Sequence, residues 1–308
     1  MIDATAISLV PMEGESASSL VLRAATVVSP FPGLVVESLF GDAEAIASAV
    51  HRHDVANDIA SSFGLEETAL REMMVLHSEN GLKIGPFTVR PRDIDQARRR
   101  VCPEVLRADR VAGIPAHQRL SWAIAPLRHD PETGEQIVDR CGCGRELLWS
   151  QTIQIDECPG CGSLLWETTI GKRPPQDLEA VQFLAELFSS SEAQRQRFRL
   201  LLPTRIAQWT EGDLLELFET IGLFSQLEVL IRLPREDSEI WTRAVGIRAA
   251  LEGMDGLRSL IGHAFDDPPT QADRLWSARR IGFANLAINR CPSAPVRALL
   301  SDLLRSYI

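Results

Sequence analysis

The chain has 308 residues, 45% hydrophobic and 24% charged, which is the composition of an ordinary globular protein with one large domain or two. Its formal net charge of −10 at pH 7 opposes a general nucleic-acid binder, because such a protein neutralises phosphates with cationic side chains. No apolar run is long enough to span a membrane, and a single tyrosine among few aromatic residues disfavours a base-stacking surface.

The first predicted element is a helix over Glu15–Val28, which ends at the Pro- and Gly-containing breaker that follows it. Its apolar side is formed by Leu20, Val21 and Ala24. Its polar residues are expected to form a capped, solvated face, and they are Glu15, Ser16, Ser19 and Arg23.

A helix-turn-helix pattern follows at Ala56–Val75, with Gly64 at the turn. Small or apolar residues stand where that motif buries them, namely Ile59, Ala60, Phe63, Leu65, Leu70 and Met73. An ordinary pair of packed helices explains the same pattern. The second helix, expected from Glu66 to Val75, is poorly suited to reading DNA.

That helix carries Glu66, Glu67 and Glu72 but only one basic residue, Arg71. Carboxylates facing phosphates would repel them. Either the motif therefore serves protein contacts, or Arg71 and His77 are its only DNA-facing groups.

Residues 83–100 form a basic island, with six basic residues against two acidic ones. In an acidic protein such an island is a candidate contact for nucleic acid or an acidic partner. The candidate residues are Arg90, Arg92, Arg98, Arg99 and Arg100. A solvated basic face beside acidic neighbours is an equally good interpretation.

Four cysteines form two close pairs, Cys141 with Cys143 and Cys158 with Cys161, about 15 residues apart. Each pair is followed by a glycine and then by Leu-Leu-Trp, the pattern of a knuckle whose tight turn presents two thiolates to one metal ion. The pattern predicts a zinc ribbon, with a strand between the pairs at Trp149–Ile155. Four thiolates leave no open position for water, so the zinc is expected to be structural.

The alternative is two buried or disulfide-bonded cysteine pairs. The chain start lacks the basic and apolar segments of a signal peptide, which favours a cytoplasmic protein with reduced thiols.

The last part of the chain reads as helices punctuated by proline. Thr210–Asp213 predicts a capping box, and a broad apolar face follows it from Leu214 to Leu230. The expected fold is mainly α with a small β zinc ribbon. Its parts are a helix-turn-helix-like domain over residues 1–100, a zinc-ribbon region over 101–172 and a helical domain over 173–308.

These elements are arranged in an order that resembles the TniQ family, the target-selection proteins of transposons related to TnsD. The resemblance covers roughly residues 10 to 165 and depends on motif order. The family's opening Glu-Ser, Ser and Arg-x-Ala helix is matched by Glu15, Ser16, Ser19, Arg23 and Ala25. Its later elements are matched by Cys102-Pro103 with Asp109, by Arg119 and Trp122, by His129, and by the two knuckles.

One departure from the family concerns its first zinc site, which would use Cys102, position 105, position 126 and His129. Val105 and Pro126 cannot ligate a metal, and two remaining ligands do not hold a structural zinc. This degraded site is expected to be packed with apolar groups.

The resemblance implies a non-enzymatic adaptor that links target DNA, or an RNA-guided DNA-binding complex, to an AAA+ ATPase of transposition. A homodimer is a possible assembly, and no membrane partner is expected. The first alternative is a zinc-containing helix-turn-helix transcription regulator that binds DNA directly. The second is an enzyme in which Cys102 pairs with His117 or His129 as a thiol nucleophile.

Overall fold

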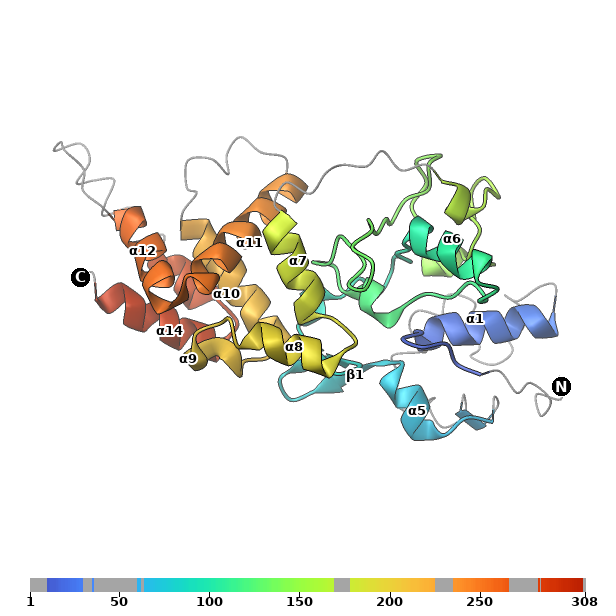
Figure 1. The fold of residues 1–308 in the computed structure, drawn as a ribbon, viewed down its shortest axis with the longest axis horizontal. Coiled ribbons are helices and arrows are strands. Elements are labelled where there is room, and N and C mark those ends of the chain that lie inside the picture. The colour runs from blue at the N-terminus through green and yellow to red at the C-terminus, as the bar shows by residue number, and fades with distance from the viewer. Residues whose placement is uncertain are drawn as a thin grey trace. The chain divides into compact units, whose positions relative to one another are not determined.

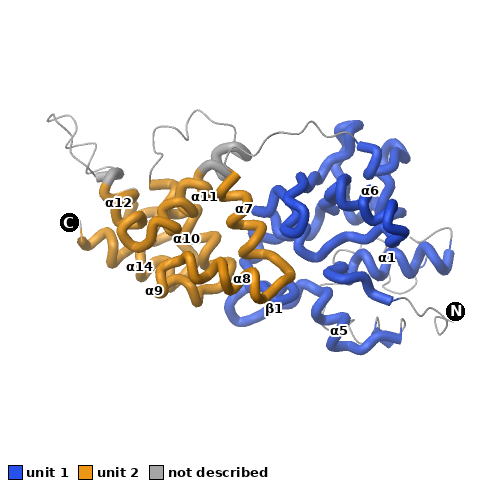
Figure 2. The backbone as a smooth tube through the Cα atoms, in the orientation of Figure 1, with its two compact units in different colours: residues 1–174 blue, residues 175–308 orange. Residues whose placement is uncertain are grey.

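The computed structural model describes residues 10–29, 35, 60–61, 64–168, 178–224, 235–265, 282 and 284–306, with backbone alone at 235–241 and 263–265. The chain divides into two compact units, Met1–Pro174 and Pro175–Ile308 (Figure 2). The segments 1–100 and 101–172 both belong to the first unit.

The fold is mainly helical, as expected, and the described residues also contain one small sheet (Figure 1). In the first unit the elements are α1 (Ala17–Val28), α5 (Glu67–Glu72), β1 (Val75–Ser78), β2 (Gly81–Ile84), β3 (Phe87–Val89) and α6 (Pro103–Val111). Short 3-10 turns occupy Pro91–Asp93, Leu120–Ala123, Trp149–Gln151 and Leu165–Glu167. In the second unit they are α7 (Leu178–Leu187), α8 (Glu192–Arg199), α9 (Thr204–Ala207), α10 (Glu211–Phe224), α11 (Arg235–Leu251), α12 (Gly253–Phe265) and α14 (Ala294–Arg305). None of the helices within these described ranges combines the length and apolarity needed to cross a membrane.

Helix α1 confirms the first predicted helix. Ser16 caps it, because its hydroxyl oxygen accepts a hydrogen bond from the Ser19 backbone N–H at 3.2 Å. The expectation of a solvated polar face is wrong. Glu15, Ser16, Ser19 and Arg23 are all buried.

A buried ion pair accounts for this burial. Arg23 donates from Nε and Nη2 to the two carboxylate oxygens of Glu15, at 2.8 and 2.7 Å. The Ser19 hydroxyl donates to the same carboxylate at 2.7 Å and accepts the backbone N–H of Gln118 at 2.9 Å. A bidentate pair of this kind satisfies both charges away from water, so polar residues enter the core.

The helix-turn-helix prediction falls partly outside the described residues, since Ile59 and Phe63 are not among them. Where it is described, Ala60, Leu70 and Met73 are buried and Gly64 has the left-handed φ of +64° that a tight turn requires. Helix α5 is shorter than predicted, because it ends at Glu72 and the chain enters β1 at Val75.

The sequence analysis did not predict the sheet. Its order is β1-β2-β3, all antiparallel, with the register Val75↔Ile84 in the first pair and Ile84↔Phe87 in the second. Leu82 and Ile84 are buried while Lys83 between them is exposed, the alternation of a half-buried strand. A Cβ at Gly81 would lie 2.4 Å from the Val89 carbonyl oxygen, so glycine is required there.

No strand forms at Trp149–Ile155, contrary to prediction. Trp149–Gln151 is a 3-10 turn, and the Thr152 hydroxyl donates back to the Leu148 carbonyl at 2.8 Å. The carbonyls of Gln154 and Ile155 accept hydrogen bonds from a side chain, that of Arg99, rather than from a neighbouring strand. Each knuckle is closed by one isolated β-bridge, Arg140↔Glu146 and Glu157↔Leu164.

In the second unit, α10 begins as predicted. The Thr210 hydroxyl oxygen accepts the Asp213 backbone N–H at 3.1 Å. Helices α10 and α11 cross closely at two glycines. A Cβ at Gly222 would lie 1.9 Å from the Thr242 carbonyl oxygen, and one at Gly246 would lie 2.0 Å from that of Phe218. The predicted face positions Leu227 and Leu230 lie outside the described residues.

Replacing Glu15 with Ala is expected to lower the free energy of unfolding of the first unit by about 3–5 kcal/mol, because it leaves the Arg23 charge buried and unpaired. Chemical denaturation followed by fluorescence measures this change. Glu67→Ala is the matched control, since it breaks an exposed i,i+4 pair with Arg71 and should cost less than about 0.5 kcal/mol. Equal losses in the two variants would contradict the prediction.

Candidate metal centre

The four cysteines of the two knuckles meet in space. Their sulfur atoms all lie within 4.8 Å of one another, and the four side chains could hold a metal ion. Cys141 Sγ lies 3.8 Å from Cys161 Sγ, and Cys143 Sγ lies 3.8 Å from Cys158 Sγ. A disulfide would need about 2.05 Å, so the cysteines are free thiols.

The two knuckles position their sulfurs with the same backbone hydrogen bonds. The Cys141 N–H donates to the Arg145 carbonyl at 2.9 Å, and the Gly144 N–H donates back to the Cys141 carbonyl at 2.8 Å. In the second knuckle the Cys158 N–H donates to the Ser163 carbonyl, and the Gly162 N–H to the Cys158 carbonyl, both at 2.9 Å.

Gly144 and Gly162 have φ angles of +87° and +69°, the left-handed region in which glycine carries no steric penalty. Each of the two sulfur contacts joins a buried cysteine of one knuckle to an exposed cysteine of the other.

The thiols differ in acidity. Burial raises the pKa of Cys141 to about 12. The Ser163 hydroxyl, 3.2 Å from the Cys161 sulfur, lowers the pKa of that exposed thiol to about 6. The Gly160 N–H donates to the Cys158 sulfur at 3.4 Å. A bound cation would deprotonate all four groups, and four sulfur ligands leave no position for a reacting water.

Arg99 clamps the loop between the knuckles. Its side chain is fully buried, and it donates to the carbonyls of Gln154 at 2.6 Å, Ile155 at 2.8 Å and Glu157 at 2.7 Å. Burial lowers its pKa to about 10. The expectation that Arg99 contacts nucleic acid or a partner is therefore wrong, because its guanidinium is enclosed by backbone carbonyls.

Arg100 is also buried, and it clamps a different segment. It donates to the carbonyls of Trp122 at 2.8 Å, Ile124 at 2.5 Å and Leu127. Burial lowers its pKa to about 10. The expectation of a partner contact is wrong for Arg100 as well.

The other arginines of the predicted contact lie nearer the surface beside acidic groups. Arg98 donates to Asp139 at 2.8 Å, and Arg71 lies 2.6 Å from Glu67. The Arg90 backbone N–H donates to Asp93, and Arg92 Nε lies 4.0 Å from the same carboxylate. His77 is exposed on β1 rather than on the helix.

The four positions of the predicted degraded site are buried or partly buried. Cys102 is the fully buried N-cap residue of α6, and burial raises its pKa to about 12. Val105 and Pro126 are buried too. His129 is partly buried, which lowers its pKa, and its Nδ1 has no hydrogen-bond partner among the described residues. Within the described part of the chain, the four knuckle cysteines form the only metal-type cluster.

Sequence reasoning missed two groups that hold the knuckles against the rest of the unit. The tryptophan after the first knuckle, Trp149, packs in the core cluster that contains α1. The tryptophan after the second, Trp166, accepts a hydrogen bond at its carbonyl from Arg107 and lies under the Arg110 guanidinium, 4.3 Å from the ring centre. The Leu-Leu-Trp that follows both cysteine pairs was the available signal.

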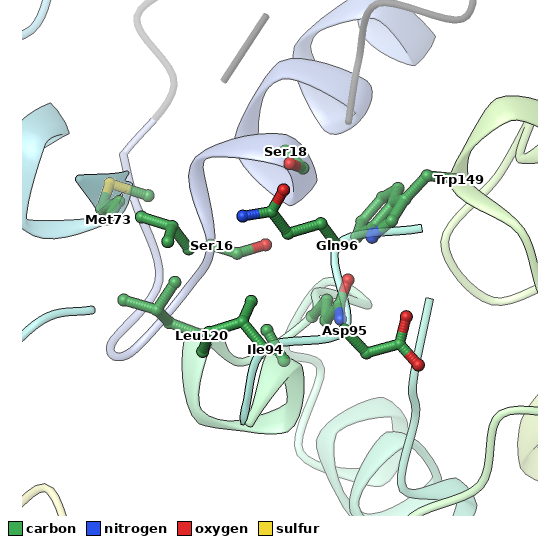
Figure 3. Close-up of a pocket in the computed structure, with 11 residues that line it drawn as sticks. Ser16, Ser18, Met73, Ile94, Asp95, Gln96, Leu120 and Trp149 are labelled. Atoms are coloured by element: carbon green, nitrogen blue, oxygen red, sulfur yellow. The ribbon is translucent and has the colours of Figure 1, made fainter. Parts of the chain in front are cut away.

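A small pocket lies beside the N-terminus of α1 (Figure 3). Ser18 of α1 and its cap residue Ser16 face Gln96 and Trp149 across it. Its volume is about 30 Å³, room for about two waters. The Oε1 atom of Gln118, which also lines it, is buried with no hydrogen-bond partner among the described residues.

No protein-family model matches this chain, and the comparison with curated proteins gives no match.

Replacing Cys158 with Ala is expected to abolish metal binding and to lower the stability of the first unit, because a structural metal supplies about 10–16 kcal/mol of binding energy that only the folded site captures. Elemental analysis of the desalted protein measures the bound metal, and thermal unfolding measures the stability. Cys102→Ala is the control, since Cys102 lies outside the cluster. Loss of the metal in Cys102→Ala, or retention in Cys158→Ala, would refute the assignment.

Proposed function

We propose that the metal is zinc and that it is structural. Zinc–sulfur bonds of about 2.3 Å in a tetrahedron place neighbouring sulfurs about 3.8 Å apart. Both contacts between the knuckles have this separation. Thiolate ligands in a four-sulfur set favour zinc over the hard cations magnesium and calcium. Bound there, zinc would cross-link two turns, each of which is closed by one isolated β-bridge of its own.

The purified protein is expected to contain one zinc per chain, because one full ligand set exists among the described residues. Elemental analysis after expression in zinc-supplemented medium checks the stoichiometry. Two zinc ions per chain would mean that the Cys102–His129 site also binds metal. A purified protein that contains no zinc would contradict the zinc assignment.

The chain as a whole is best explained as a non-enzymatic adaptor of the TniQ type, which selects a transposition target by docking DNA or a DNA-bound complex to an AAA+ ATPase. The observation that carries this proposal is spatial. Three of the motifs on which the resemblance depends are far apart in the sequence, yet residues of the Glu-Ser helix, Asp109 after the Cys-Pro pair and the Arg-x-x-Trp element contact one another in one largely buried polar network.

The network begins at the N-terminus of α1 and extends to the Arg-x-x-Trp element. Glu15 forms a β-bridge with Arg119, and the Ser16 backbone N–H donates to the Gln118 carbonyl at 2.9 Å. The Arg119 guanidinium lies 3.9 Å from Asp109, the acidic residue of the Cys-Pro element.

The network then reaches the hairpin after His129. Arg119 also lies 3.4 Å from Asp130, and the Trp122 indole N–H donates to the same carboxylate at 2.7 Å. Asp130 is fully buried. In this chain the network gives these separated motifs one shared structural role, which supports the proposal.

The surface favours docking over direct reading of DNA. The would-be recognition helix α5 has six residues, with Glu66 and Glu72 exposed and the Arg71 guanidinium held by Glu67. Two of the five arginines in the basic island are buried. In the proposed assembly the partner supplies most phosphate contacts, which suits a chain of net charge −10. The Cys102 thiol is buried with a raised pKa, which makes it a poor nucleophile.

A pull-down tests the adaptor role. The full-length protein is immobilised and offered the AAA+ ATPase encoded beside it, labelled double-stranded target DNA, or both. The expected result is capture of the ATPase, and of DNA only when the ATPase is present. DNA captured by the protein alone, with an affinity that falls steeply with salt, would instead support the direct transcription regulator. Capture of neither component would overturn the proposal.

Charge reversal sharpens this test. Arg92→Glu is expected to reduce ATPase-dependent DNA capture severalfold, because Arg92 is the most exposed arginine of the basic island, with 47% of its side chain accessible, and the added carboxylate repels phosphates. Arg258→Glu in the second unit is the matched control, at 50%. Equal capture by the two variants would remove the basic island from the interface.

A further inference from the structure

A zinc ion bound by four thiolates carries a net charge of −2, and here two of the four sulfurs belong to buried cysteines. A charge of this size in a partly desolvated site needs compensation nearby. Donors around the sulfurs, such as the Gly160 N–H, supply only partial charges. Full positive charges close to the two knuckles must therefore supply the rest of the compensation.

The first cation is Arg99, a buried positive charge that itself needs negative charge nearby. It is a full positive charge at zero exposure, its guanidinium donates to three neutral carbonyls, and its Nε is buried with no hydrogen-bond partner among the described residues. A buried charge without a counter-charge is strongly destabilising. Arg99 Nη2 donates to the carbonyl of Glu157, the residue before the knuckle cysteine Cys158, at 2.7 Å. The carboxylate of Asp156 and the sulfur of Cys158 are the negative groups that favour the protonated form of Arg99.

The second cation is Arg145, which belongs to the first knuckle and whose side chain packs against the second. A Cβ placed on Gly160 would lie 2.2 Å from Arg145 Cδ and 3.3 Å from its Nε. The arginine side chain therefore occupies the space that any larger residue at position 160 would need. Gly160 stands between Cys158 and Cys161, so the guanidinium lies over the second knuckle on the exposed side.

We propose that Arg99 from the buried side and Arg145 from the surface are the two cations that balance the four-thiolate zinc centre, and that the metal affinity of the site depends on both. Their two charges equal the −2 of the zinc–thiolate group. They are positioning residues, since neither ligates the metal. The proposal rests on the zinc assignment and is independent of the adaptor function.

Arg100 is a buried arginine with a structural role alone, so it can be compared with Arg99. It is as buried as Arg99 and also bonds three carbonyls, but those carbonyls belong to residues 122–127. The charged groups that act on it are Arg128, Asp95, Asp139 and Arg98, with no knuckle cysteine among them. Arg100 is therefore the matched control for Arg99.

The surface half of the proposal is tested by the zinc dissociation constant of the isolated full-length protein, measured with Zn²⁺ alone against a chromogenic chelator. Arg145→Gln is expected to weaken binding on the order of tenfold at low salt. Gly160→Ala is expected to do the same with no change in net charge, because the new Cβ displaces the guanidinium while the backbone φ at this position stays ordinary. Arg71→Gln removes one charge from the same unit and should leave the constant unchanged.

The salt dependence of zinc binding distinguishes an effect of charge from an effect of packing. At about 1 M salt the screening length falls to about 3 Å, so the Arg145→Gln effect should shrink while an effect of packing would persist. The absorption of the Co²⁺-substituted protein provides a second readout, since it reports whether four sulfurs still ligate the metal.

The buried half compares three variants. Arg99→Met is expected to weaken zinc binding on the order of 100-fold. Arg99→Lys keeps the charge but loses the forked hydrogen bonds, so it should be as unstable as Arg99→Met yet bind zinc more tightly. Arg100→Met should be destabilised without a matching loss of zinc affinity.

Two results would overturn the proposal. One is equal affinity in Arg145→Gln, Gly160→Ala and Arg71→Gln. The other is an equal loss in Arg99→Met, Arg99→Lys and Arg100→Met, which would show that only folding matters. If Arg99→Met does not fold, the zinc affinities of Arg145→Gln and Gly160→Ala test the proposal. Because neither DNA nor the ATPase is present, failure here leaves the adaptor proposal standing.

Discussion

The central part of the first unit depends on cross-links between turns, because it has little regular secondary structure to hold it. From Ile94 to Trp166 the backbone pairs through isolated β-bridges and short 3-10 turns, with α6 as its one α-helix. One kind of cross-link is the pair of buried guanidinium groups of Arg99 and Arg100. A second would be the four-sulfur cluster with the proposed metal bound. Adjacent residues in an extended segment point to opposite sides, so this pair can clamp two different loops from one short piece of chain.

These cross-links connect the metal centre to the N-terminal helix. Arg99 fixes the loop that leads to Cys158, and its backbone N–H donates to the Leu147 carbonyl at 2.7 Å. Trp149 then enters the core that contains α1. A scaffold of this kind suits the proposed adaptor, because the free energy of metal binding would hold the turns in place.

The same polar network relates the structure to the proposed adaptor function. Glu15, Arg119, Asp109 and Asp130 lie on four different segments, and each is buried or half-buried in contact with another charged group. Such a network is costly unless its charged members are paired, and each of these four side chains lies beside an opposite charge. In the proposed adaptor, the candidate partner surfaces among the described residues of the first unit include the exposed acidic side of α5 and the outer arginines of the basic island. Their opposite signs suit a bridge between a protein and a nucleic acid better than a single DNA-reading face.

The sequence by itself determined the elements that depend on local chemistry. Cysteine spacing predicted the four-residue cluster, apolar periodicity with a serine cap predicted α1, and the Thr210 cap predicted the start of α10. Only the tertiary structure decided which polar residues are buried. Periodicity assumes that charged side chains face water, but Arg23 and Arg99 are buried because partners 8 and more than 50 residues away satisfy them. The missing strand at Trp149–Ile155 has the same cause, since its carbonyls bond a distant guanidinium that no local pattern reveals.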